Sequence, residues 1–198
     1  TVKSIQEVSK KCLETGTTGF LVTSVTSSLE QLLGMIKAVK ETIGKEEGAK
    51  ILGIHLEGPY LNPIKKGMQD PNHLRLPDLD EMKEIKLYAE GLLKMVTIDP
   101  ELPGAHEVID YLISEGVVVA AGHTNATYEE GIAAFNKGVN HITHCCNAMP
   151  NIHHREPGIT LAALEDERVS IQAIVDNIHL HPGMVRLMHK TKQAHNIV

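Results

Sequence analysis

Three residues of the types that bind divalent metals follow short apolar runs of the chain. Glu57, His123 and His144 each come where such a run ends. Two imidazoles and one carboxylate suit zinc or ferrous iron, and three protein ligands leave a coordination position open for water. A metal held in this way lowers the pKa of bound water to about 7 and polarises a carbonyl oxygen. The residue types therefore predict metal-dependent hydrolysis.

Each of the three residues also has a structural explanation when it is taken alone. A histidine at a strand end is commonly a hydrogen-bonded core or rim residue. Glu57 is the stronger signal, because a carboxylate between an apolar run and Gly58-Pro59 would be desolvated without a partner or a metal. Together, at the ends of successive runs, the three residues favour a metal site over three separate structural roles.

Histidine is unusually frequent and clustered. The chain has twelve histidines, and six of them lie within 41 residues: His141, His144, His153, His154, His179 and His181. Histidine is the commonest metal ligand and changes protonation near neutral pH, so the cluster points to chemistry. An affinity tag would be contiguous and terminal, and this cluster is neither.

The elements that must position these residues alternate between short β-rich runs and amphipathic helical stretches, which is typical of successive βα units. Strands are predicted at 19–24, 50–56, 93–98, 117–121, 139–143 and 169–175, with the start of a seventh at 196–198. Helices are predicted at 4–15, from Ser27 or Ser28 to 43, from 78, at 103–115, from 127, at 158–165 and from 182.

Two architectures fit this pattern, an open doubly wound sheet and a (β/α)₈ barrel. Polar residues follow five different strands: His55 and Glu57, Asp99, His123, His144, and Asp176 with His179. A barrel gathers five strand ends around one point, whereas an open sheet spreads them along a line. No glycine-rich nucleotide-binding motif supports the open sheet. We therefore expect an α/β fold, an incomplete (β/α)₈ barrel of TIM type in which residues 1–198 form one partial catalytic domain.

Composition excludes some other roles. With 198 residues, 42% of them hydrophobic, the chain can bury a substantial core, and its net charge of −6 offers no basic face for nucleic acid. No apolar run approaches the roughly 20 residues of a membrane span. Three cysteines without framework spacing indicate a reducing, cytoplasmic setting rather than a disulfide scaffold.

The flanking residues resemble a known family. The motifs that carry the resemblance are His55-Leu-Glu-Gly-Pro59, Gly122-His-Thr-Asn-Ala126, Thr143-His144 with Asn147-Ala-Met149, His154-Arg-Glu-Pro-Gly158 and Asp176-Asn-Ile-His179. In this order and spacing they are similar to the N-acetylglucosamine-6-phosphate deacetylases of the amidohydrolase superfamily. The resemblance runs from about residue 5 to residue 198.

The resemblance implies a reaction and assigns roles. The reaction is hydrolysis of the acetamide of N-acetylglucosamine 6-phosphate to glucosamine 6-phosphate and acetate. Glu57, His123 and His144 would bind the metal, expected to be zinc, with iron, manganese or cobalt as alternatives and one or two ions bound. The substrate-binding residues would be Met68, Asn147, Ala148, Arg155, Asp176 and His179. Arg155 and His179 would hold the phosphate, one of them from a neighbouring subunit, so a homodimer is expected.

The phosphate residues have competing explanations. A guanidinium gives phosphate two parallel hydrogen-bond donors, which an acidic protein needs locally. Arg155 could instead pair with Glu156 or Glu167 at the surface. For Asp176 and His181, helix capping and rim packing compete with a role in binding.

Three residues depart from the family pattern. Cys145 and Cys146 replace bulkier residues and are expected to pack beside His144 rather than bind metal. Met68 replaces a smaller residue in the sugar-facing loop. Asn177 stands where glycine is common, and asparagine tolerates the left-handed conformation that glycine would allow.

The general base of the family, an aspartate, is expected about three residues beyond Val198, and a His-x-His pair for a second metal would precede Thr1. The chain is therefore expected to be a segment of a longer enzyme, inactive by itself and without a catalytic base of its own. Two alternatives remain. One is another amidohydrolase acting on a cyclic amide or a nucleobase. The other is a non-catalytic fragment that binds metal or sugar phosphate.

Overall fold

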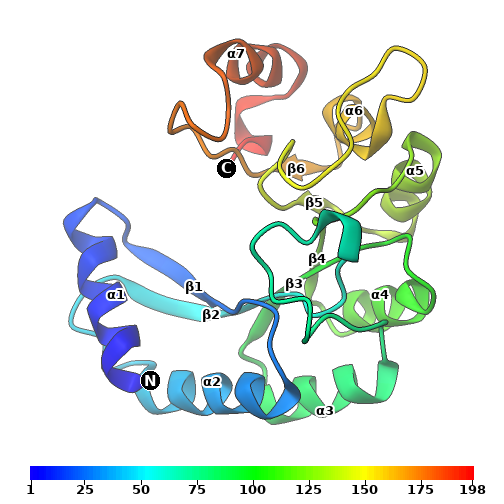
Figure 1. Cartoon of the computed structure of the whole chain (residues 1–198). Coiled ribbons are helices and arrows are strands. Elements are labelled where there is room, and N and C mark those ends of the chain that lie inside the picture. The colour runs from blue at the N-terminus through cyan, green and yellow to red at the C-terminus, as the bar shows by residue number, and fades with distance from the viewer.

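A computed structural model describes residues 1–198 and contains one parallel sheet whose six strands follow one another in chain order (Figure 1). The strands are β1 (Gly19–Thr23), β2 (Lys50–Glu57), β3 (Leu93–Ile98), β4 (Val118–Ala121), β5 (His141–Ile142) and β6 (Ser170–Ile171). Every neighbouring pair is parallel. Sequential order with parallel pairing is what a barrel requires, and the sheet is a curled half-barrel, as the sequence predicts.

Helices connect the strands and lie along the outside of the curved sheet (Figure 1). They are α1 (Val2–Glu14), α2 (Leu29–Thr42), α3 (Leu79–Ala89), α4 (Ala105–Ser114), α5 (Tyr128–Lys137), α6 (Gly158–Glu165) and α7 (Pro182–Thr191), with short 3₁₀ turns η1 (Pro63–Lys65) and η2 (Ala194–Asn196). Successive helices contact one another. They enclose one apolar cluster of 36 buried residues between themselves and the sheet.

Local sequence signals set most helix starts. Ser28 and Thr127 each form a capping box, with Gln31 and Glu130 respectively. Asp78 accepts from the backbone N–H groups of residues 80 and 81 and so caps α3. Side-chain oxygens in these places satisfy N–H groups that have no partner within the helix. The predicted starts at 28, 78, 127 and 182 are therefore confirmed.

Several predicted boundaries differ from the structure: the helix expected at 4–15 is Val2–Glu14, and the strand expected at 139–143 is only His141–Ile142. The helix expected from 103 begins at Ala105, because Gly104 has a left-handed backbone with φ +84° and serves as its N-cap. The strand expected at 169–175 is reduced to Ser170–Ile171. Its only partner on the far side is Ile197, through an isolated bridge, so little pairing extends it. The bridge places Ile197 beside β6 where the seventh strand is expected, but Asn196 belongs to the 3₁₀ turn η2.

Glycine is needed where β2 approaches β3. Gly53 has φ +148°, and a Cβ there would lie 2.6 Å from the carbonyl oxygen of Leu92. The pairing register between β2 and β3 changes directly after this glycine, between Ile54 and His55. Because side chains alternate between the two faces of a strand, this shift helps determine which residues of β2 face the barrel interior.

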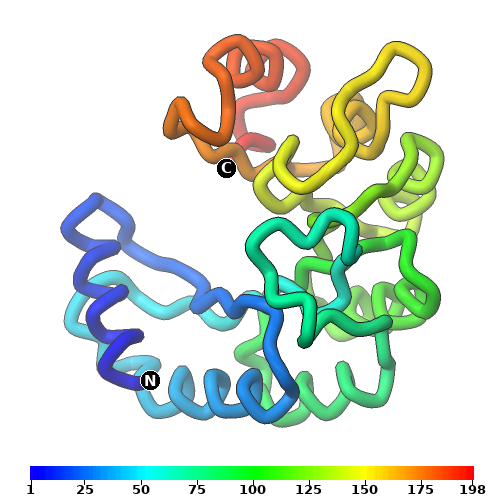
Figure 2. The backbone as a smooth tube through the Cα atoms, viewed as in Figure 1, coloured from blue at the N-terminus to red at the C-terminus, as the bar shows by residue number.

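The half-barrel is an arc with α1 at one end and α7 at the other (Figure 2). The long segment after β2, residues 58–77, lies over the carboxyl ends of the strands (Figure 1). No helix combines the length and apolar character needed to cross a membrane.

Candidate metal centre

Glu57, His123 and His144 converge at the carboxyl ends of β2, β4 and β5. The Nε2 atom of His123 lies 3.0 Å from Oε1 of Glu57 and 3.0 Å from Nε2 of His144. The Nε2 atom of His144 lies 3.6 Å from the same carboxylate oxygen. Glu57 is the last residue of its strand, and each histidine comes two residues after its strand ends. The predicted convergence of these three side chains is confirmed.

These spacings fit a tetrahedral metal site. Ligand atoms about 2.0–2.1 Å from a metal in tetrahedral geometry lie about 3.3 Å from one another. The three observed separations, 3.0, 3.0 and 3.6 Å, bracket that value. Two imidazole nitrogens at 3.0 Å also cannot both carry a proton toward each other. The donor set therefore suits a shared cation.

His123 is held by residues 58–77. Its Nδ1 lies 2.8 Å from the carbonyl oxygen of Lys65, so Nδ1 carries the proton and donates it. With Nδ1 used in this way, Nε2 is the ring atom that faces Glu57 and that can bind a cation. The backbone N–H of Asn62 donates to the carbonyl oxygen of His123 at 2.9 Å. The backbone of His123 is left-handed, with φ +48°. Such strain persists where the surroundings fix it, and it is common at functional sites.

Glu57 is ionised despite being largely buried. Burial by itself would raise its pKa, but hydrogen bonds and charge from His123 and His144 more than offset burial and hold the pKa well below its usual range. The side-chain amide of Gln69 also donates to its Oε1 at 2.9 Å. A carboxylate that accepts several hydrogen bonds stays ionised and is ready to bind a cation.

His144 has less support than His123. Its backbone N–H donates to the side-chain oxygen of Gln172 at 3.3 Å, and its φ is +32°. Its Nδ1 is buried and has no hydrogen-bond partner. Metal-binding histidines commonly donate this second N–H to a carbonyl or carboxylate. The two imidazoles of the site therefore differ in how firmly the fold holds them.

A polar layer lies below the ligands in the barrel interior. The Nε2 atom of His55 is 2.7 Å from the hydroxyl of Thr97, which is 2.7 Å from the hydroxyl of Thr143. Burial lowers the pKa of His55 to about 4, so this imidazole is neutral at pH 7. Although His55 lies two residues before Glu57, it contacts this layer and not the metal ligands.

Asp99, at the end of β3, is completely buried, and one of its carboxylate oxygens has no hydrogen-bond partner. Burial raises the pKa of Asp99 to about 7, and the neighbouring negative charge of Glu101 adds to the rise. Glu101 accepts hydrogen bonds from the side chain of Asn62 and the backbone of Asn125. Asp99 lies at the predicted rim but is not one of the metal-binding group.

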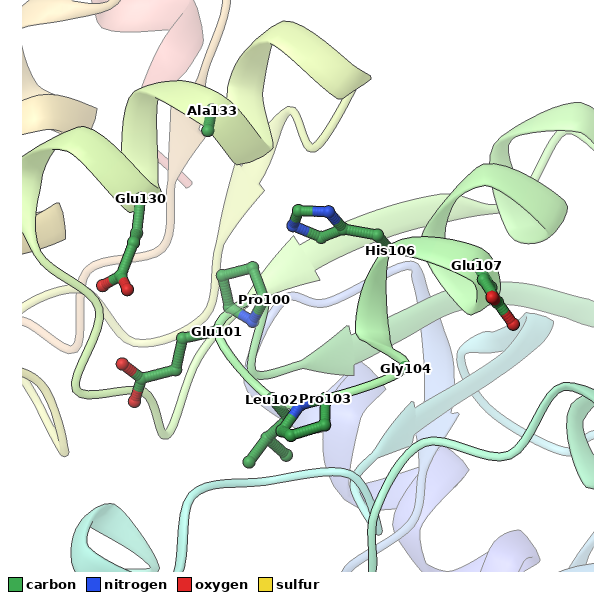
Figure 3. Close-up of a pocket in the computed structure, with 9 residues that line it drawn as sticks. All are labelled: Pro100, Glu101, Leu102, Pro103, Gly104, His106, Glu107, Glu130 and Ala133. Atoms are coloured by element: carbon green, nitrogen blue, oxygen red, sulfur yellow. The ribbon is translucent and has the colours of Figure 1, made fainter.

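A cavity of about 380 Å³ lies beside this segment, between residues 100–107 and α5 (Figure 3). Its lining includes Glu101, His106, Glu107 and Glu130, and none of the three metal-binding residues reaches it. The candidate metal centre therefore lies outside this cavity.

The model of the amidohydrolase family matches residues 2–198. The chain belongs to the amidohydrolase family. This family is metal-dependent, which agrees with the Glu, His and His group at the strand ends.

Relatives of this amidohydrolase act on phosphorylated amino sugars. The chain is 35% identical over 195 residues to an N-acetylglucosamine-6-phosphate deacetylase from Bacillus subtilis, and the alignment covers 96% of this chain and 49% of the relative. It is 35% identical over 173 residues to an N-acetylgalactosamine-6-phosphate deacetylase from Escherichia coli O157:H7, covering 87% and 46%. The chain thus spans about half the length of the curated relatives it matches.

A solved structure shows the same architecture. It is a variant of N-acetyl-D-glucosamine-6-phosphate deacetylase from Mycobacterium smegmatis in complex with N-acetyl-D-glucosamine-6-phosphate. The TM-score is 0.84 at 38% identity, covering 91% of this chain and 46% of that one.

Arg155 of the amidohydrolase is exposed and pairs with no carboxylate. Its guanidinium contacts Nε2 of His154 at 2.8 Å, and no salt bridge joins it to Glu156 or Glu167. The surface ion pair that competed with a phosphate role is therefore absent. Arg155 lines a cavity of about 240 Å³, but Glu129 and Glu156 line it too, so the local charge is mixed.

Asp176 and His179 contact each other at 2.7 Å and are both exposed. Asp176 also accepts from the backbone N–H groups of residues 178 and 179, and these bonds lower its pKa to about 2. Asn177 between them has φ +63°, the left-handed conformation expected of it. No contact joins His179 to Arg155, nor Asp176 to the metal ligands. Asp176 and His179 are therefore outside the metal-binding group, and the sixth strand ends at Ile171, earlier than predicted.

Three other residues considered in the sequence have defined roles in the fold. His181 caps α7 by accepting from the backbone N–H of Gly183, so its capping role is confirmed. Asn147 donates to the carbonyl oxygens of His144 and Cys145. Cys145 is fully buried in the core and outside the metal-binding group, as its predicted packing role requires.

Two predicted substrate positions, Ala148 and Met68, belong to segments that lie close together, because a Cβ added to Gly67 would lie 4.0 Å from the Cβ of Ala148. Ala148 has a left-handed backbone with φ +51°. Met68 is exposed on the loop after β2. Next to it, a Cβ added to Gly67 would lie 3.3 Å from Cε1 of His123. The loop therefore passes within contact distance of the metal site at this point.

Sequence reasoning missed the supporting residues. Gln69, the carbonyl oxygen of Lys65 and the hydroxyl of Thr97 all lie next to metal ligands or beneath them. The only available signal was that Gln69 directly follows Gly67-Met68, the segment assigned to the sugar-facing loop. A polar residue in a long loop has no periodicity that would indicate its partner.

Proposed function

We propose that this chain provides the metal centre of a deacetylase that hydrolyses N-acetylglucosamine 6-phosphate to glucosamine 6-phosphate and acetate. The observation that carries the proposal is the approach of Glu57, His123 and His144 to within 3.0–3.6 Å of one another at the barrel rim. About 35% identity to deacetylases of phosphorylated amino sugars supports the substrate class.

Zinc is the proposed metal, with iron, manganese or cobalt as alternatives and one or two ions in the complete enzyme. The nitrogen and oxygen donors and their near-tetrahedral spacing support this choice. When bound, the metal lowers the pKa of its water ligand to about 7 and polarises the acetamide carbonyl.

The residues of this chain bind and orient in the reaction. Glu57, ionised by its hydrogen bonds, and the Nε2 atoms of His123 and His144 would hold the cation. Asn147, Ala148 and Met68 orient the sugar, and the strained backbone of Ala148 supports a role for main-chain groups. The residue that takes the proton from water and returns it to the leaving amine is proposed to be an aspartate about three residues beyond Val198.

Arg155 and His179, with Asp176 fixing the imidazole, are proposed to bind the 6-phosphate. Two facts support this assignment: Arg155 has no carboxylate partner, and Asp176 holds His179 at 2.7 Å. No hydrogen bond joins Arg155 to His179 within one chain, which agrees with the proposal that the phosphate site is completed between two subunits of a homodimer. Arg155 then supplies two parallel donors to the phosphate.

A second candidate substrate differs only at one sugar hydroxyl. The relative from Escherichia coli acts on N-acetylgalactosamine 6-phosphate and is also 35% identical. We propose the gluco epimer first, because more than one relative at similar identity is named for it.

We also propose that residues 1–198 form part of a single barrel domain in the cytoplasm. The single apolar cluster and the three free cysteines support this.

The test is acetate release by the full-length protein that contains this sequence. The substrates are N-acetylglucosamine 6-phosphate, its galacto epimer and unphosphorylated N-acetylglucosamine. We expect turnover of the first, a much lower kcat/KM without the phosphate, and loss of turnover in Glu57→Gln and His144→Ala. Unchanged activity in either variant would contradict the metal assignment. Activity on a cyclic amide or nucleobase alone would place the protein elsewhere in the family.

A further inference from the structure

The loop after β2, residues 58–77, makes three hydrogen bonds with the metal ligands. Lys65 accepts from Nδ1 of His123, and Asn62 donates to the carbonyl oxygen of the same histidine. Gln69 donates to Glu57. The loop is therefore part of the support of the site, in addition to passing over it.

Gln69 is the one side chain among these contacts, and both ends of its amide are used. Its Nε2 donates to Oε1 of Glu57 at 2.9 Å, and its Oε1 accepts the backbone N–H of Thr26 at 2.7 Å. The residue is only 2% exposed. The two partners fix the orientation of the amide, because an ionised carboxylate can only accept and a backbone N–H can only donate. Gln69 therefore joins the segment after β1 to the metal-binding carboxylate at the end of β2.

We propose that Gln69 is a positioning residue of the metal centre, which acts by holding Glu57 in the orientation that binds the cation. The inference deepens the proposed function, on which it rests for the identity of the site. Its amide occupies one lone pair of Oε1 without adding a formal charge, so the carboxylate keeps its negative charge for a divalent ion. The rotamer of Glu57 is thereby fixed before metal binds.

A different explanation is that Gln69 merely tethers the loop. In that case its loss would act on the site through Lys65 and His123, whose contact depends on the loop path. The two explanations differ in one measurable respect. A residue that acts through Glu57 has no effect once Glu57 is gone, whereas a loop tether keeps its effect.

The experiment is a titration of this chain with Co²⁺, followed by visible absorption, for the native sequence and Gln69→Met. Methionine has similar length and flexibility but forms neither hydrogen bond. We expect cobalt binding to weaken about 10–100-fold, the range typical of lost partners of metal ligands. The matched control is Gln193→Met, because Gln193 is exposed and makes no side-chain capping bond. Native affinity in Gln69→Met would overturn the proposal.

A double-mutant cycle separates the two explanations. In a Glu57→Ala background, adding Gln69→Met should change cobalt affinity less than about twofold, because contacting residues couple and independent ones add. A further loss of tenfold or more in that background would show a loop tether and would overturn the positioning role. Circular dichroism of each variant checks the fold, and Gln69→Ala replaces Gln69→Met in the same cycle if the methionine variant unfolds.

The outcome is independent of the proposed reaction. Native acetate release by the full-length protein together with unchanged cobalt affinity in Gln69→Met would reject the role of Gln69 alone. Weakened cobalt binding in that variant, in a full-length protein that releases no acetate from any of the three sugars, would reject the proposed function alone.

Discussion

The metal centre and the proposed phosphate residues both follow strands, but they differ in burial and in how many hydrogen bonds hold their side chains. Glu57 and His123 are largely buried, and each has partners from a distant part of the chain. Arg155, Asp176 and His179 are exposed and contact only close neighbours in sequence.

The difference follows from solvation. A buried carboxylate and two imidazoles at about 3 Å need fixed partners, because water cannot relieve their polarity. Exposed charged groups are solvated, so they need no fixed protein partners before a ligand or a second subunit binds. The metal centre is thus built by the chain itself, and the proposed phosphate residues remain accessible to solvent.

Loss of a metal ligand should have the largest effect. Because losing a supporting partner costs about 10–100-fold in metal affinity, losing a ligand should cost more than about 100-fold. Glu57→Gln and His123→Ala should both show this in a Co²⁺ titration of the chain. Glu84→Gln, a change at an exposed helix position, serves as control and should bind as the native chain does. A loss of cobalt affinity below tenfold in both variants would contradict the view that Glu57 and His123 form a preorganised metal site.

Asp99 provides a second test of the buried region, because one of its carboxylate oxygens has no hydrogen-bond partner. Its pKa of about 7 when folded exceeds the ordinary value near 4, so the folded state binds more protons between those values. The native protein should therefore lose stability as pH rises through that window.

Asp99→Asn removes this titration and should stabilise the fold by about 1–3 kcal/mol at pH 8, with a much smaller gain at pH 5. Urea unfolding at both pH values measures it. Asp110→Asn is the control, because Asp110 forms a surface ion pair with Lys137. An equal gain for Asp99→Asn at both pH values would contradict a buried carboxyl with a raised pKa.

Arg155→Ala should have the smallest effect on the fold. An exposed side chain without a carboxylate partner contributes within about 0.5 kcal/mol, so stability and cobalt affinity should stay native. In the full-length protein the preference for the 6-phosphate should fall by about 10–100-fold, since charge-assisted hydrogen bonds contribute about 1.5–3 kcal/mol. Arg168→Ala, at an exposed arginine paired with Asp166, should leave that preference unchanged. A clear loss of stability in Arg155→Ala would show that the loop is structural.

The sequence by itself determined the order of elements and the metal-binding group. Period-2 and helical patterns, the caps at Ser28, Asp78 and Thr127, and polar residues placed just after strands are local signals. Parallel strands in chain order then bring Glu57, His123 and His144 to one rim without further information. Their chemistry follows from residue type.

Only the tertiary structure decided what supports these ligands and which strand-end residues stay away from them. The amide of Gln69 reaches Glu57 across 12 positions, and the carbonyl of Lys65 reaches His123 across 58. Asp176 and His179 follow the strand predicted at 169–175, yet they are exposed and contact each other rather than the metal ligands. Hydrogen bonds between distant segments depend on the path of a long loop, and that path is set by packing across the whole rim rather than by any repeating pattern along the chain.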